Sequence, residues 1–235
     1  MASYRWTSIW AGLVLLAGTT TASAQVSGDV TVQSDYRLRG DSISSGQPVA
    51  MLDLSYDHPS GFYANGSVIG EMDEGDAALL GTVGEIGYAR RITPTLSLDG
   101  GVSRTEYRYA YGYDYSVDYN EVYVGLYGRS LSGHLYYSPD YYYRGMRTLY
   151  GELEASKEVA AQIRLSARGG VLNYVDMPAG RRRPRTQYDW RLAASRQFGP
   201  VDLRAALTGG GPGCDYYEFG ARKRTAVVVS ASWTF

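Results

Sequence analysis

Beyond an apolar N-terminal stretch, hydrophobic and polar residues alternate with a period of two along the whole chain. In the last segment one face carries Val227, Val229 and Trp233, and the other carries Ser230 and Ser232. Successive side chains of a β-strand point to opposite faces. The alternation therefore predicts strands with one apolar and one polar face, and helical spacing of apolar residues is hard to find.

Turn signals divide this pattern into strands joined alternately by short turns and longer loops. The short turns lie at 57–61, 91–94, 129–133, 157–161 and 198–201, and the longer loops at 40–47, 73–78, 109–116, 140–145, 176–185 and 209–223. Between them we expect strands near 26–39, 48–57, 61–72, 79–91, 94–108, 116–129, 132–140, 146–157, 161–175, 186–198, 200–209 and 224–235.

An even strand count with short turns at one end and long loops at the other is typical of bacterial outer-membrane barrels. In lipid the sheet must close, because an open edge would leave backbone groups without hydrogen-bond partners. We therefore predict an all-β fold, a transmembrane up-and-down antiparallel β-barrel of about 12 strands, formed by one domain, residues 25–235. A soluble sandwich or lipocalin-like barrel also alternates, but it needs an apolar interior. Here the apolar face, rich in small residues and Tyr, suits lipid contact.

The N-terminus has the features of a secretory signal peptide. Arg5 lies before an apolar stretch from Ile9 to Ala17, and residues 22–24 form an Ala-Ser-Ala cleavage site. The apolar stretch is about 10 residues, short of the roughly 20 that a transmembrane helix needs. We expect residues 1–24 to be a signal peptide cleaved near Ala24, and the mature chain to reach the outer membrane of a Gram-negative bacterium.

Composition and charge exclude several other classes. The chain has 29 Gly and 23 Tyr, as expected for a sheet protein with many tight turns. A formal charge of -1 argues against a nucleic-acid partner. The single Cys214 excludes an intramolecular disulfide and a metal cluster built from several cysteines. With no phosphate-binding loop, dinucleotide fingerprint or metal-ligand spacing, we expect no cofactor and no metal.

The chain also resembles a known family. Residues 34–40 (SDYRLRG), followed by Gly46, Gln47 and Pro48 and then by residues 60–64 (SGFYA), are similar to the opening of the TorF-like porin family of proteobacterial outer-membrane proteins. Residues 120–126 (NEVYVGL) and the closing strand add to the resemblance. It implies an outer-membrane barrel and a porin. The sequence departs from this pattern at Asp41 and in the arginine-rich loop 181–185.

The polar face predicts the residues that line the barrel interior. If Trp233 and Phe235 face lipid, the inward-facing charges include Asp53, Glu85, Asp99, Glu121, Glu152, Glu154, Arg164, Arg168, Asp189, Arg191, Asp202 and Arg204. Most acids lie on one arc and most arginines on the other. In an open barrel this arrangement would create a transverse field that orients polar solutes. Alternatively, the same charges form salt bridges that fill a closed interior. The channel is favoured by small residues at inward-facing positions, which leave volume in the interior: Ser97, Gly101, Gly125 and Ser166.

The long loops supply candidate binding residues. Tyrosines crowd residues 107–119 and 136–143, where they would form an outer interfacial girdle or, if the rings point inward, stack on a flat ligand. Arginines between 181 and 185 would bind lipopolysaccharide phosphate or form a solvated loop without a partner. The external candidates are Arg181, Arg182, Arg183, Arg185, Tyr111, Tyr113 and Tyr142.

These features predict a channel rather than an enzyme. Outer-membrane lipases and proteases use a His near the outer rim, but His58 and His134 lie in or next to short turns. We expect a porin-like channel for passive diffusion of small polar or charged solutes, in contact with outer-membrane lipid. The alternative is a closed structural or ligand-binding barrel that acts through its external loops. No feature of the sequence indicates an oligomeric state.

Overall fold

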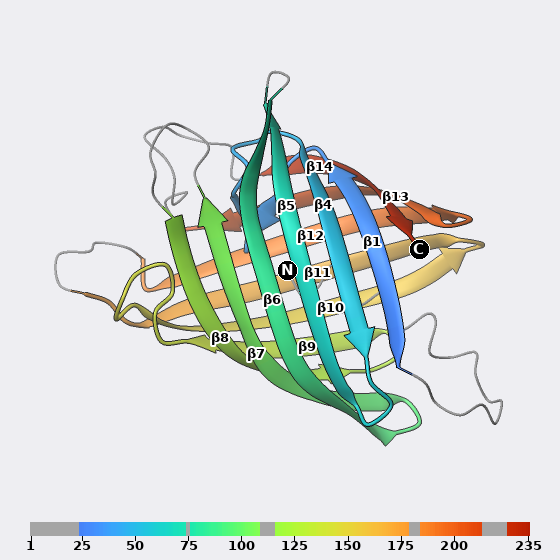
Figure 1. Cartoon of the computed structure of the whole chain (residues 1–235), viewed down its shortest axis with the longest axis horizontal. Helices are drawn as coiled ribbons and strands as arrows, with labels where there is room; N and C mark the ends of the chain where they lie inside the picture. Colours follow the sequence, from blue (N-terminus) through green and yellow to red (C-terminus); the bar gives the residue numbers. More distant parts are fainter. Residues whose placement is uncertain (1–23, 74–75, 109–115, 179–183, 213–224) are drawn as a thin grey trace.

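The structure, a computed structural model, describes residues 24–73, 76–108, 116–178, 184–212 and 225–235. Within these residues twelve antiparallel strands form one closed barrel (Figure 1). They are β1 (Gln25–Gln33), β4 (Val49–Asp57), β5 (Phe62–Asp73), β6 (Asp76–Thr93), β7 (Leu96–Arg108), β8 (Ser116–Tyr127), β9 (Leu131–Ser138), β10 (Arg147–Ala160), β11 (Ile163–Asp176), β12 (Thr186–Phe198), β13 (Val201–Gly211) and β14 (Ala226–Thr234).

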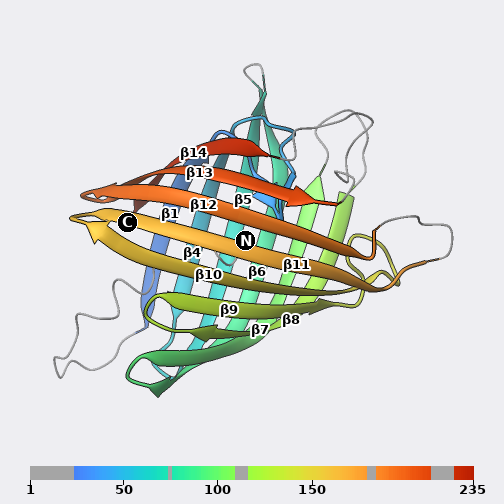
Figure 2. The same cartoon turned by 180° about the vertical axis from the view of Figure 1, so that it is seen from behind.

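Each strand pairs with its neighbours in sequence, and β1 closes the barrel against β14, with Val30 opposite Trp233. The view from behind shows the sheet continuing through β9 to β14 (Figure 2). The predicted fold class is confirmed, and all but the first of the predicted strands end within a few residues of those observed. Among the described residues, no helix is long and apolar enough to cross a membrane.

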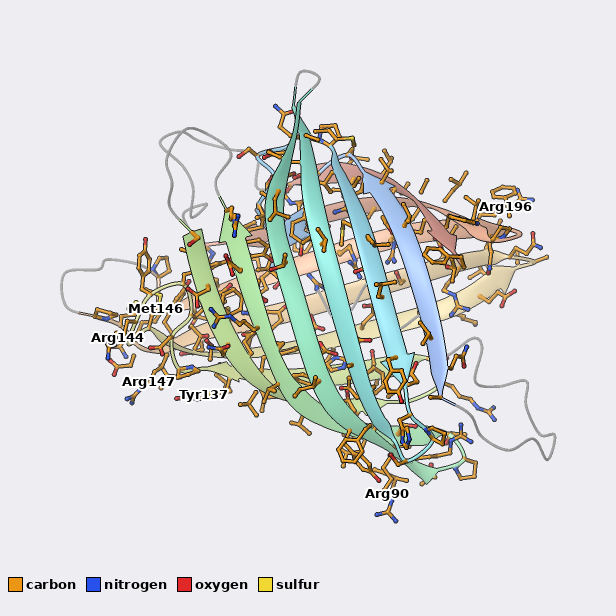
Figure 3. The ribbon with its side chains drawn as sticks, in the orientation of Figure 1. Arg90, Tyr137, Arg144, Met146, Arg147 and Arg196 are labelled. Atoms are coloured by element: carbon orange, nitrogen blue, oxygen red, sulfur yellow. The ribbon has the colours of Figure 1, made fainter. Side chains whose placement is uncertain are left out.

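The outer face of the barrel is apolar and the inner face is polar. Leu153 on β10 and Ile86 on β6 point outward and are more than half exposed, whereas Glu152 and Glu154 point inward and are buried. Arginines mark both ends of the apolar belt: Arg90 and Arg196 lie at the end with the short turns, and Arg144 and Arg147 at the end with the long loops (Figure 3). This is the reverse of a soluble barrel and fits one that lies in a bilayer.

The first predicted strand, residues 26–39, is wrong at its C-terminal end. β1 stops at Gln33, and residues 34–48, here called the inner loop, turn into the barrel and form a small hairpin of β2 (Arg37–Leu38) and β3 (Asp41–Ser42). Arg39 and Gly40 at its tip have φ angles of 49° and 87°, which reverse the chain tightly. Leu38 is 5% exposed. Residues 40–47, predicted as a loop outside the barrel, therefore belong to its interior.

Tyrosine rings on the inner face lie over glycines of neighbouring strands. The Tyr150 ring covers Gly170, and the Tyr63 ring covers Gly87, so a Cβ at either glycine would meet the ring. The volume predicted at Gly101 and Gly125 is filled in the same way, by Tyr123 and by His134. These glycines thus provide room for aromatic side chains and not for solvent, which corrects the sequence interpretation.

Candidate functional site in the barrel interior

The inner loop is tethered to the opposite wall by a buried ion pair. Nη2 of Arg39 lies 2.8 Å from both carboxylate oxygens of Glu121 on β8, and both side chains are 7% exposed. Burial alone lowers the pKa of the Arg39 guanidinium, but the Glu121 carboxylate raises it to a value above the ordinary one. Arg39 is therefore a permanently charged anchor.

Tyrosines surround the same guanidinium. The Cζ atom of Arg39 lies 4.2 Å from the ring centre of Tyr150, 5.1 Å from that of Tyr141 and 5.7 Å from that of Tyr136. All three rings are buried. Aromatic faces attract cations within about 6 Å, so the three rings and Glu121 form a site of matched charge. We call these four residues the Arg39 cage.

The inner loop crosses the interior from one wall to the other. On one side the Tyr36 hydroxyl lies 3.3 Å from that of Tyr107 on β7. On the other side, Cα of Gly210 on β13 lies 3.4 Å from the position that a Cβ at Gly40 would take. Because the walls it touches lie on opposite sides of the barrel, the inner loop narrows the interior at the end with the long loops.

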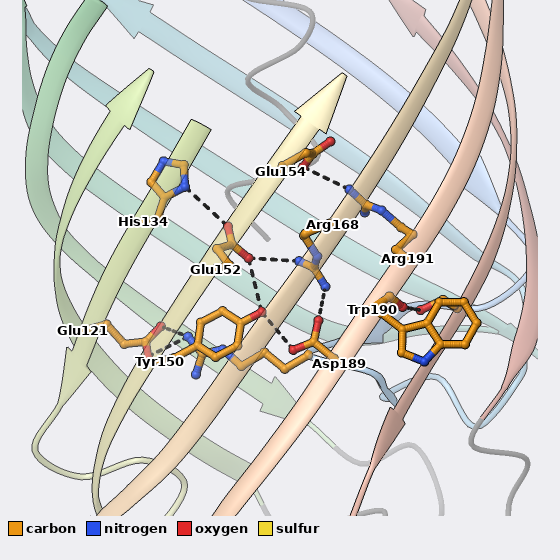
Figure 4. Close-up of polar contacts among 11 residues, drawn as sticks. Glu121, His134, Tyr150, Glu152, Glu154, Arg168, Asp189, Trp190 and Arg191 are labelled. Atoms are coloured by element: carbon orange, nitrogen blue, oxygen red, sulfur yellow. Dashed lines mark hydrogen bonds and ion pairs between the residues drawn. The ribbon is translucent and has the colours of Figure 1, made fainter. Parts of the chain in front are cut away.

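A second charged cluster lies on β10, β11 and β12 (Figure 4). Arg168 bridges Glu152 at 3.1 Å and Asp189 at 2.8 Å, and the Tyr150 hydroxyl donates toward the same two carboxylates. Arg191 pairs with Glu154 at 3.3 Å. The two inner-face arginines in this cluster are therefore matched by carboxylates of β10 and β12.

Two carboxylates on the other arc, Asp99 and Glu85, bind neutral donors. Tyr63 donates to Asp99 at 3.0 Å, and the Asn65 amide donates to Glu85 at 3.0 Å. Toward the short turns the interior is less filled, since Glu85, Arg164 and Arg204 are only half-buried. Among the described residues no group of three or more His, Cys, Asp and Glu is arranged to hold a metal ion.

All twelve charged residues predicted to face inward have that orientation in the structure. Nine of them come from seven strands: Asp53, Asp99, Glu121, Glu152, Glu154, Asp189 and Arg191 are buried, and the guanidinium of Arg168 and the carboxylate of Glu85 make inner-face hydrogen bonds. Arg164, Asp202 and Arg204 lie nearer the short turns and are half-buried.

Of the residues predicted to bind ligands in the external loops, the structure describes two, Tyr142 and Arg185. Tyr142 is wrong as an external residue, because its ring is 8% exposed and packs against Tyr119 and Tyr141. The predicted girdle is wrong for these rings and for Tyr107 as well, whereas Tyr137 does point outward. Arg185 is exposed. Outside the described residues lie Tyr111, Tyr113, Arg181, Arg182, Arg183 and Cys214.

Sequence reasoning missed Arg39, His134 and Tyr150. His134 faces inward, and its Nδ1 lies 3.5 Å from Glu152. The alternation along the strands could have identified two of them. His134 lies opposite the inward-facing Glu152 in the β9–β10 pair, and Tyr150 is two residues before Glu152 and so shares its face of β10. Arg39 carried no local signal, since its partner is 82 residues away.

Comparison with known proteins supports the architecture. A family described as "Bacterial protein of unknown function (Gcw_chp)" matches residues 17–235. A sequence comparison with curated proteins gives no significant match.

Among solved structures, a NanC porin is similar with a TM-score of 0.58 at 9% identity, covering 89% of this chain and 99% of that one. A KdgM porin is similar with a TM-score of 0.55 at 12% identity, with the same coverage. A KdgM porin in complex with disordered oligogalacturonate gives a TM-score of 0.54 at 12% identity, again covering 89% of this chain and 99% of that one. At these identities the likeness establishes a shared barrel fold.

Proposed function

The chain belongs to the Gcw_chp family of bacterial proteins of unknown function, and from this premise we propose that it is a porin-like channel of the outer membrane for passive diffusion of small polar or charged solutes. One observation carries the proposal: the closed twelve-strand barrel has an apolar exterior and a charged interior. The inner loop narrows this interior at one end but does not fill the barrel along its full length. A barrel of this size lies between those filled by side chains and wide aqueous porins.

The twelve inner-face charges are proposed to line the diffusion pathway. The acids of β4 to β8 form one wall, and the arginines of β11 to β13 contribute most of the positive charge of the other. Arg168 and Arg191 are paired with carboxylates, and Arg164 and Arg204 near the short turns add positive charge to the same wall. Opposite charges across a narrow pathway would orient polar solutes as they pass.

We propose that the short turns face the periplasm and the long loops the outside, as in other outer-membrane barrels. The predicted signal peptide, residues 1–24, and the resemblance to the TorF-like porin family support this location. Arg185 and the neighbouring arginines 181–183 would then meet lipopolysaccharide phosphate, which guanidinium groups bind bidentately.

A closed ligand-binding or structural barrel is the second candidate. The burial of the inner loop and of the surrounding tyrosines favours it, because together they occupy the interior at the long-loop end. In this case the barrel would act through its external loops, as an anchor or a binding protein and not as a pathway.

Single-channel recording separates the two candidates. The mature chain, residues 25–235, would be refolded and inserted into a planar bilayer. Discrete conductance steps with ion selectivity are expected for the channel. A folded, heat-modifiable barrel that produces no steps under any voltage, and whose Arg39→Ala variant is also silent, would contradict the channel and support the closed barrel.

A further inference from the structure

The Arg39 cage has the composition of a binding site for a planar cation. Glu121 offers a carboxylate, and three buried tyrosine rings offer their faces or edges. These groups come from three strands and the loop before β10, so the barrel scaffold positions most of them independently of the inner loop. Arg39 therefore occupies the site much as a bound ligand would.

The inner loop holds Arg39 in this site at a cost. Nη1 of Arg39 is buried without a hydrogen-bond partner among the described residues, and an unsatisfied buried donor is destabilising. The backbone of Arg39 also has a φ of 49°, in the left-handed region that residues with a side chain rarely adopt. A free cation in the cage would carry no backbone strain.

We propose that the Arg39 cage is a binding site for the guanidinium group of a diffusing solute, and that Arg39 is its built-in competitor. A solute guanidinium would take over the carboxylate of Glu121 and the ring faces, and the inner loop would leave the interior. The binding step stands on the cage alone, whereas the opening step rests on the channel function proposed above.

The geometry favours guanidinium over ammonium. A guanidinium is planar, binds a carboxylate through a rigid fork of donors and stacks on aromatic rings, and it is less strongly hydrated than an ammonium. Arg39 lies over the Tyr150 ring and reaches both oxygens of Glu121 through Nη2 alone. A free guanidinium, which no loop holds in place, could turn so that two of its nitrogens pair with this carboxylate. An ammonium of similar size could satisfy the charge but not the planar fit.

Binding is tested first in the folded barrel in detergent, without reference to transport. Arg39→Ala empties the cage, so methylguanidinium chloride is expected to raise the Tm of this variant by about 3 °C, the shift of roughly one kcal/mol for a chain of this size. Methylammonium chloride at the same concentration is the matched control and should have no such effect. The Arg39→Ala/Glu121→Gln double variant should lose the response to methylguanidinium.

A second measurement uses the unmodified chain. Trypsin cleaves after arginine, and Arg39 is buried, so the bond between Arg39 and Gly40 should resist cleavage until the inner loop is displaced. Methylguanidinium is expected to accelerate cleavage at this bond several-fold relative to methylammonium. The rate at the exposed Arg129 serves as the internal reference.

Equal effects of the two cations in both assays, or an undiminished response in the double variant, would overturn the cage as a guanidinium site. The channel hypothesis is judged separately in the bilayer. If the cation assays succeed but every variant is electrically silent, the site stands and the channel function falls. If conductance appears but neither cation assay responds, the channel stands and the cage proposal falls.

Discussion

Gly40 at the tip of the inner loop lies directly against Asp189 on β12: a Cβ at Gly40 would lie only 3.0 Å from the Cβ of Asp189. Asp189 is also the partner of Arg168 at 2.8 Å. The tip of the inner loop therefore rests on the charged cluster of β10 to β12, while its Arg39 is held on the other side by Glu121. The loop and the cluster form one continuous polar assembly across the interior.

Gly40→Val is expected to push the inner loop off this wall. Valine is strained at a φ of 87°, by about 1–2 kcal/mol, and its side chain would collide with Asp189, which adds about 1–3 kcal/mol. We expect a lower free energy of unfolding in urea and a larger single-channel conductance. Gly46→Val is the matched control, since Gly46 has a φ of 81° but no atom within 4 Å of the added Cβ. Equal conductance in the two variants would contradict the contact.

Removing one partner of the Arg39–Glu121 pair should cost more than removing both. Glu121→Ala leaves a buried guanidinium without its carboxylate, which typically destabilises by about 3–5 kcal/mol. The Arg39→Met/Glu121→Met double variant removes the uncompensated charge and should recover most of that loss. Free energies of unfolding for the single and double variants give the coupling energy. Strict additivity would mean that the pair does not interact in the folded barrel.

The barrel itself could be predicted from the sequence because its signals are local. Alternation reports which face each residue takes, and Gly and Pro mark the turns, so strands such as β10 and β12 were located from their own residues. The inner loop could not be predicted in this way. Tyr36 and Leu38 continue the alternation of β1, and nothing within residues 34–48 indicates that Arg39 pairs with a residue on β8.

The same distinction explains the tyrosines. Tyr119 and Glu121 share one face of β8, so parity alone orients Tyr119 inward. Composition led instead to a girdle, because tyrosine is common at membrane interfaces. Tyr142 lies in a loop, with a φ of 61°, so no alternation along a strand orients it. Its inward direction follows from the packing of its ring against Tyr119 and Tyr141.

The covering of glycines by tyrosines predicts a steric effect at specific positions. A valine at Gly87 on β6 would collide with the Tyr63 ring on β5, and overpacking of this kind costs about 1–3 kcal/mol. Gly84→Val, on the same strand but on the outer face with open space around it, should be neutral. Urea unfolding midpoints compare the two. The Tyr63→Ala substitution should relieve part of the defect of Gly87→Val, because a Cβ at Gly87 would also lie 2.9 Å from the backbone oxygen of Gly100. No relief at all would show that the Tyr63 ring is not a source of the strain.

The charge distribution predicts cation preference. The described inner faces of β4, β5, β7 and β8 carry no arginine or lysine. Two acids lie on this side of the interior, Asp99 on β7 and Glu85 on the neighbouring β6. Neutralising both, by Asp99→Asn and Glu85→Gln, should reduce the potassium-to-chloride permeability ratio measured from reversal potentials in a salt gradient. Asp118→Asn, an acid on the outer face paired with Arg104, is the control and should leave the ratio unchanged. Neutralising Arg164 with Glu121 should shift the ratio less, because one charge of each sign is lost.

The apolar outer face predicts a cost that depends on depth. Leu153 lies midway along β10 and is 61% exposed, and Val159 lies on the same face near the short-turn end and is 53% exposed. On a membrane barrel an arginine at the bilayer midplane costs about 2–4 kcal/mol, but near the interface only about 0–1 kcal/mol. Leu153→Arg should therefore slow folding into lipid vesicles and lower stability well below Val159→Arg, as measured by heat-modifiable gel mobility and urea titration. On a soluble barrel both arginines would point into water, and both substitutions would lower the stability by similarly small amounts. Equal effects of the two substitutions would therefore contradict the membrane assignment on which the channel depends.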